Sequence, residues 1–119
     1  PDPASRAVLA ALYLRAGMAG KTLDLLLPAW QRDLSPEEMR LVVQAERLQG
    51  QNKRALELGR GVDPANPQPP DPDLWALVAI VCHDNGDEDE GRRALDAALR
   101  LAPDNTGLKL YDSLLRRER

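Results

Sequence analysis

The chain has 119 residues, of which 43% are hydrophobic and 3% aromatic, and its formal net charge is -3. This acidic balance argues against a nucleic-acid-binding protein, because neutralising phosphates requires a basic face. A single cysteine excludes an internal disulfide, and there is no run of about 18 apolar residues that could span a membrane. Leu, Ala, Arg and Glu are abundant and favour helix over strand, so we expect one all-α domain over residues 1–119.

The cysteine usage also bears on the compartment. A single thiol fits a reducing environment and no signal peptide is present, so we expect a cytoplasmic protein. A targeting segment removed ahead of Pro1 is an alternative that the sequence leaves open. The polar last helix favours a natural end of the chain, whereas the opening stretch PDPAS fits either a true start or a remnant of a linker.

The first predicted helix lies within residues 5–17 and ends at Gly17. Apolar residues recur in it at helical spacing, namely Val8, Leu9, Leu12 and Tyr13. A second helix is expected over residues 21–32, but Pro28 lies inside it and lacks the amide hydrogen that a helix interior needs. We therefore expect this helix to kink or to end early near Pro28.

A strong helix start follows. Ser35 is a capping residue, Pro36 suits the first turn, and Glu38 completes a capping box. This third helix is expected to run to about Gln49, and residues 51–61 predict a shorter fourth helix.

The chain then changes character. Residues 62–73 carry five of the ten prolines and are expected to form a stiff, extended connection rather than a helix. Asp73 is predicted to cap a helix that runs to about residue 84. The next helix is expected over residues 88–101, and the last one begins at residue 105 or 106.

The turn glycines recur at a nearly constant interval. Gly17, Gly50 and Gly86 are separated by 33 and 36 residues. A period of this length is typical of a helical repeat array, in which each helix pair buries its apolar face against the next. The sequence thus predicts three helix-turn-helix pairs and one further helix.

The third helix pair carries an ordered series of large, small and turn residues that extends over 34 residues from Pro72. The series is Trp75, Val78, Ala79, Cys82, Gly86, Gly91, Leu95, Ala98 and Pro103. This pattern resembles the tetratricopeptide repeat (TPR), with Cys82 in place of the usual aromatic residue and Gly91 in place of the usual alanine.

The other two pairs match the family pattern less well. Arg6 lies where the first repeat needs a large apolar residue, and Glu46 and Gly59 break the pattern of the second. The resemblance implies a right-handed superhelical stack of three TPR-like repeats with a C-terminal capping helix. The implied repeats are residues 3–36, 36–69 and 72–105, and the cap is residues 106–119.

The stretch CHDNGDEDE combines a thiol, an imidazole and five acidic side chains within nine residues. It could form a metal or catalytic site, or only the corner of a helix hairpin. The TPR frame places Cys82 in an inward slot, where a free cysteine acts as a small hydrophobe, and places the last four acids at a helix start, where the dipole favours them. His83 is expected on an exposed helix face without a second ligand spaced to assist it. We therefore expect no metal, no cofactor and no enzymatic activity.

In a TPR array the first helix of each pair lines a concave groove. The residues that the resemblance assigns to this groove are Ala7, Ala11, Leu14, Arg15, Arg40, Gln44, Arg47, Leu48, Ala76, Ile80, His83 and Asp84. Arg40 and Arg47 lie two turns apart on one helix face and could together bind a carboxylate. The expected partner is a helical or extended segment of another protein, with apolar anchors and an acidic group. An alternative that stays open is that these are ordinary solvated or inter-repeat packing positions.

The expected function is a non-catalytic module for protein–protein interaction. The size and the three-pair layout are similar to the small TPR chaperones of bacterial type III secretion, which implies a chaperone or an assembly adaptor. A TPR segment of a larger scaffold protein is the first alternative, and a self-associating structural module, such as a homodimer, is the second. The Lys-Asn pattern of family members that capture heat-shock protein tails is absent from the groove positions, so that partner is not expected.

Overall fold

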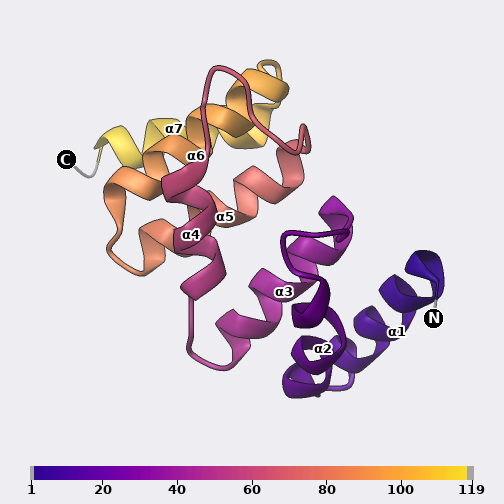
Figure 1. Ribbon diagram of the computed structural model, residues 1–119. Helices are drawn as coiled ribbons and strands as arrows, with labels where there is room; N and C mark the ends of the chain where they lie inside the picture. The colour runs from indigo at the N-terminus through magenta and orange to yellow at the C-terminus, as the bar shows by residue number, and fades with distance from the viewer. Residues whose placement is uncertain (1, 118–119) are drawn as a thin grey trace. The chain divides into compact units, whose positions relative to one another are not determined.

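The computed structural model describes residues 2–117, and in this part of the chain the fold is all-α. Seven α-helices and one short 3-10 segment, η1, account for the regular structure of these residues (Figure 1). Their bounds are α1 Pro3–Arg15, α2 Ala19–Leu26, η1 Leu27–Ala29, α3 Pro36–Leu48, α4 Lys53–Gly61, α5 Pro72–Asp84, α6 Glu88–Leu101 and α7 Thr106–Arg117.

The chain divides into two compact units, which we call the N-terminal unit (Pro1–Arg54) and the C-terminal unit (Ala55–Arg119). In the N-terminal unit, α1, α2 and α3 pack on one another. In the C-terminal unit, α5 packs along α6, and α7 lies against α6. Figure 1 shows α1, α2 and α3 in indigo to magenta, and α5, α6 and α7 in salmon to yellow. The prediction of a single domain stays a prediction.

Four helices begin in the same way. The side chains of Asp2, Ser35, Asp71 and Asn105 accept hydrogen bonds from the backbone N–H three residues ahead, at the starts of α1, α3, α5 and α7. At Ser35 the predicted capping box is complete, since Glu38 accepts in return from the Ser35 N–H. The predicted cap of α5 was wrong by two residues. Asp71, and not Asp73, caps the helix, because Pro72 is best tolerated as its first residue.

Three glycine turns end α1, α3 and α5 in one common geometry. Gly17, Gly50 and Gly86 have φ values of 77°, 73° and 86°, a region that costs glycine nothing. The residue after each glycine donates its N–H to the carbonyl five residues before it, at 2.8 Å, 2.8 Å and 2.9 Å. This is the Schellman arrangement. The predicted glycine turns after these three helices are therefore confirmed, whereas the stacking of the helix pairs stays a prediction.

The second helix is shorter than predicted. It begins at Ala19 and ends at Leu26, and Pro28 lies in η1 instead of continuing the helix to residue 32. The expectation of an early end near Pro28 is confirmed, because a proline cannot donate the hydrogen bond that the next helical turn requires.

The core of the N-terminal unit forms where α2 and α3 pack on one side of α1. Its buried members are Ala10, Ala19, Leu23, Leu26, Leu41, Val42 and Ala45. The larger apolar residues of α1 lie elsewhere, because Val8, Leu9 and Leu12 are exposed. The small side of α1, and not its large apolar side, therefore faces its neighbours.

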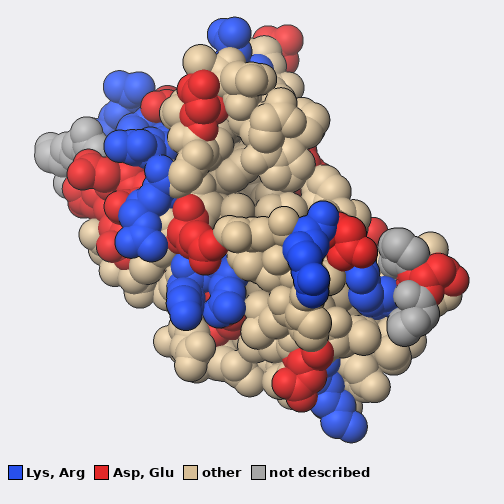
Figure 2. Space-filling model, in the orientation of Figure 1, with Lys and Arg blue, Asp and Glu red and all other residues tan. Residues whose placement is uncertain are grey.

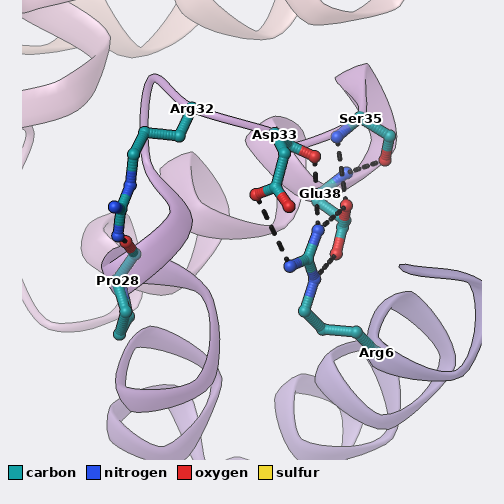
Figure 3. A network of polar contacts seen from close by, with 6 residues as sticks. All are labelled: Arg6, Pro28, Arg32, Asp33, Ser35 and Glu38. Carbon is teal, nitrogen blue, oxygen red and sulfur yellow. Dashed lines mark hydrogen bonds and ion pairs between the residues drawn. The ribbon is translucent and has the colours of Figure 1, made fainter. Parts of the chain in front are cut away.

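A buried ion pair joins the starts of α1 and α3. The guanidinium of Arg6 donates to both carboxylate oxygens of Glu38, at 2.6 Å and 3.0 Å, and the side chain of Glu38 has no exposed surface (Figure 3). Arg6 also donates to the carbonyl of Asp33. Burial by itself would raise the pKa of Glu38, but the hydrogen bonds from Arg6 and Ser35 outweigh it and hold that pKa below its ordinary 4.5. Arg6, which departs from the family pattern, thus has a buried partner.

The second departure, Glu46, also belongs to a buried ion pair. Its carboxylate accepts from the backbone N–H of Arg54 at 2.9 Å and from the Arg54 guanidinium at 2.8 Å. Arg54 is the second residue of α4. Glu46 therefore satisfies a free N–H at the start of α4 from the preceding helix.

The third departure, Gly59, lies where α4 meets α5 and α6. A Cβ atom at this position would lie 3.0 Å from Cβ and 3.1 Å from the carbonyl oxygen of Glu90, and 3.4 Å from Sγ of Cys82. Only glycine allows the backbones to approach so closely.

The last helix has one buried apolar side chain and one ionic contact with α6. Leu108 is buried, and Arg92 of α6 donates to Asp112 of α7 at 2.7 Å. This hydrogen bond from Arg92 is the main cause of the lowered pKa of Asp112.

We predict that Glu38→Gln lowers the free energy of unfolding by about 3 kcal/mol, because it removes the buried counter-charge of Arg6 and leaves only the exposed carboxylate of Asp33, at 3.7 Å. Chemical denaturation at neutral pH measures the change. An Arg6→Met/Glu38→Leu double variant should recover part of the loss, since apolar replacement removes both buried charges together.

The same carboxylate predicts an acid limb in the stability profile. Its pKa is lowered on folding, so its contribution is complete above about pH 4.5 and is lost as the pH falls through the folded-state pKa. Glu38→Gln should flatten that limb, and a variant as acid-sensitive as the parent chain would contradict this role.

Gly59→Ala should destabilise the fold by about 1–3 kcal/mol, because the added methyl group meets backbone and not a flexible side chain. Gly61→Ala in the same helix is the matched control. A Cβ atom there meets nothing within 4 Å, so we expect unchanged stability or a gain of about 0.5 kcal/mol. Thermal unfolding of both variants checks the prediction, which fails if the two shift the midpoint equally.

Candidate partner-binding site

The predicted groove residues of α1 are mostly engaged in packing. Ala7 is buried, and Ala11 and Leu14 are half-buried against the core of the N-terminal unit. Arg15, the last residue of the helix, is exposed. Because three of these four side chains pack inside the protein, Arg15 is the only predicted groove residue of α1 that is accessible to a partner.

The predicted residues of α3 lie at the surface of the same unit. Gln44, Arg47 and Leu48 are exposed and Arg40 is half-buried. Both arginines interact with other residues of the chain. An acidic group of a partner would therefore have to compete for them or extend interactions that already exist.

In the C-terminal unit, Ala76 and Ile80 line a hollow of about 300 Å³ between α5 and α7. The remaining lining residues are Pro72, Asp73, Asn105, Gly107, Leu108 and Tyr111. The walls are therefore largely apolar, with two polar groups at the starts of the two helices. A concave, mostly apolar surface with few polar groups is the usual form of a binding site.

Sequence reasoning missed the α7 half of this hollow. The last helix is predicted to be a cap that covers the end of the stack, and Leu108 and Tyr111 are not among the predicted groove residues. A signal was present in the sequence, because Asn105 precedes α7 as Asp71 precedes α5, and both side chains cap their helices. Continuing the repeat frame by one further helix would have placed Leu108 opposite α5.

His83 differs from its expected position on an exposed helix face. Its ring is half-buried and contacts α6 at Gly91, where a Cβ atom would lie 2.8 Å from the imidazole. The ring also makes a T-shaped contact with Tyr111 of α7, with 6.0 Å between the ring centroids and an interplanar angle of 72°. Gly91 thus makes room for the imidazole. Asp84, the fourth predicted residue of α5, is exposed at the end of the helix.

Cys82 is buried, as predicted from its inward slot. Its thiol lies 3.6 Å from the carbonyl oxygen of Ala55 in α4. Burial, followed by the charges of Asp87 and Glu90, raises the pKa of the thiol to about 12. A thiol in this setting stays protonated at neutral pH and is a poor nucleophile or metal ligand.

The acidic residues after Gly86 begin α6, as predicted. Glu88, Asp89 and Glu90 form its first turn, where the positive end of the helix dipole favours carboxylates. Among residues 2–117, no group of three or more His, Cys, Asp or Glu side chains is arranged to hold a metal ion. The same residues include no helix that is long and apolar enough to cross a membrane.

The charged surface is mixed in sign. On the face shown in Figure 2, blue basic and red acidic side chains alternate along each unit, with tan uncharged areas between them. A partner that binds this face would therefore contact both basic and acidic side chains.

Comparisons of the chain with protein-family models, with curated proteins and with solved structures found no match.

We predict that Cys82 reacts with a soluble disulfide reagent only when the protein unfolds. A pKa of about 12, against an ordinary 9.0, leaves about a thousandfold less thiolate at a given pH, and burial blocks access in addition. The reaction rate of the native chain at mildly alkaline pH, compared with the rate in denaturant, measures the protection.

The matched control is Arg93→Cys in a Cys82→Ala chain, which offers a single exposed thiol on α6. This control should react at the rate of a free thiol. Equal rates for Cys82 and the control in the native state would show that the α4–α5 contact opens readily.

Proposed function

We propose that the chain is a non-catalytic, TPR-like module that binds a helical or extended segment of a partner protein. The feature of the fold that supports this proposal is the regular recurrence of the same helix starts and turns along the chain. Capped helix starts recur at α1, α3, α5 and α7, and glycine turns of one geometry follow the first three of these helices. The superhelical stacking of the pairs and membership of the TPR family are parts of the proposal, which rest on the sequence resemblance.

The observation that carries the proposal is the apolar hollow between α5 and α7. Ile80 is 36% exposed at its wall, although it is a large apolar side chain that would be better buried. The volume of about 300 Å³ is at the small end of ligand pockets. It is suited to one or two apolar side chains that project from a peptide segment, as in recognition of an amphipathic helix.

The polar groups of the hollow indicate which polar groups a partner would carry beside its apolar side chain. Asp73 is exposed at the rim and would favour a basic or hydrogen-bond-donating group beside the apolar anchor. The acidic group that the sequence predicts in the partner belongs with Arg40 and Arg47 of α3. Because those arginines already interact within the chain, the apolar anchor and not the acid is the main determinant in our proposal.

We further propose that the chain acts as a chaperone or an assembly adaptor. A cytoplasmic chaperone or assembly adaptor of a bacterial secretion system rests on the similarity of the three-pair layout to the type III secretion chaperones. A segment of a larger scaffold is the alternative with the same binding chemistry. The two differ in the identity of the bound protein, because a chaperone holds a secreted subunit and a scaffold holds an intracellular component.

Site-specific photo-crosslinking from the hollow tests the proposal. A photoreactive amino acid at position 80 in the otherwise native chain, expressed in the source cell, should produce one main adduct with another protein. Mass spectrometry of the adduct identifies the partner and locates the crosslinked segment, which should contain an apolar side chain in a helical or extended stretch.

The same photoreactive residue at position 93, exposed on α6, is the control and should give no such adduct. Ile80→Glu, with the label moved to position 76, should abolish the adduct while circular dichroism shows an intact fold. Equal labelling from positions 80 and 93, or an adduct that survives Ile80→Glu, would contradict a site in the hollow.

A further inference from the structure

The exposed apolar residues of α1 occupy positions that are buried in α3. The capped starts at Asp2 and Ser35 set a register of 33 residues between the two helices. Val8, Leu9 and Leu12 therefore correspond to three core residues of α3, namely Leu41, Val42 and Ala45. In α3 this face packs on α1 and α2, whereas in α1 Val8 is 62% and Leu12 53% exposed.

The exposed face of α1 has the form of an interface and is not a scatter of single side chains. Ala4, Ser5, Val8, Leu9 and Leu12 line a shallow hollow of about 360 Å³. Contiguous apolar surface of this kind on a helix that already has a packed opposite side marks a place for a second protein surface.

The last described helix, α7, also exposes apolar residues, but on the side that is buried in α1. Asn105 starts α7 in the register of Asp2, 103 residues earlier. Leu110 and Leu114 therefore correspond to Ala7 and Ala11 of α1; Ala7 is buried, and Ala11 is half-buried against the core that α1 forms with α2 and α3. In α7 these positions are 61% and 45% exposed.

The chain already contains one interface of this kind, between α1 and α3. The exposed residues of α1 match the residues that α3 contributes to that interface, and the exposed residues of α7 match those that α1 contributes. We propose that α7 of one copy packs on α1 of a second copy through Leu110 and Leu114 against Val8, Leu9 and Leu12. The contact continues the helix series from one copy to the next, and it goes beyond the proposed partner site because it uses neither Ile80 nor the α5–α7 hollow.

The proposed contact is heterologous, since each copy contributes a different face. Such contacts close into rings or extend into filaments, and they do not stop at a symmetric dimer. The wild-type chain should therefore form species larger than a dimer as its concentration rises, which sedimentation velocity and light scattering measure directly.

Two variants separate the faces. Val8→Glu/Leu12→Glu removes the α1 face and keeps α7, and Leu110→Glu/Leu114→Glu does the reverse. Each should be a monomer by itself, because burying the introduced carboxylates in the contact is unfavourable. An equimolar mixture of the two variants should form a 1:1 heterodimer and nothing larger, because one intact α7 face meets one intact α1 face.

Arg93→Glu is the control, because it lowers the net charge by the same two units at an exposed position of α6 and should associate like the wild type. All the substituted positions are exposed, and far-ultraviolet circular dichroism with thermal unfolding verifies that each variant folds. A wild-type chain that stays monomeric up to millimolar concentration overturns the proposal. So does a mixture that fails to form a heterodimer, or a dimer that only one of the two double variants abolishes.

Discussion

The distance between each helix cap and the glycine turn that follows is the constraint on which the rest of the structure depends. It fixes the first helix of every pair at 13 residues, in α1, α3 and α5 alike. Because the helices are equally long and start in the same register, corresponding positions of α1, α3 and α5 can be compared directly. The positions of Leu41, Val42 and Ala45, which are buried in α3, correspond to the exposed positions of Val8, Leu9 and Leu12 in α1.

The residues that depart from the TPR sequence pattern each have a structural role that depends on another part of the chain. Arg6 and Glu46 each place a charge in a slot for a large apolar or aromatic side chain, and each is bound by an opposite charge on a neighbouring segment. Gly59 loses a side chain where two helices approach closely. A buried charge without a partner would cost several kcal/mol, so a single repeat pattern cannot show whether such a departure is harmful. The partner lies in another part of the chain.

The sequence predicts features that depend on neighbouring residues better than features that depend on contacts between distant parts of the chain. The Ser35 capping box, the glycine turns and the early end near Pro28 depend on residues a few positions apart, and the sequence predicts them, although it places the cap of α5 at Asp73 and not at Asp71. The sequence pattern of α1 did not reveal which of its sides would be buried, because that depends on α2 and α3 packing against Ala10 and not against Leu9. In the hollow, Ile80 was predicted from the repeat frame, whereas Tyr111 was missed because its role depends on α7 lying across α5.

The contact of His83 with Gly91 and Tyr111 has a spectroscopic consequence. The chain has one histidine, so its imidazole gives a single, unambiguous set of proton resonances. The imidazole lies 6.0 Å from the tyrosine ring of α7, centroid to centroid, so its protons sense the ring current of that side chain. The chemical shift of one side chain therefore reports whether α5, α6 and α7 are assembled, in a protein that needs no added label.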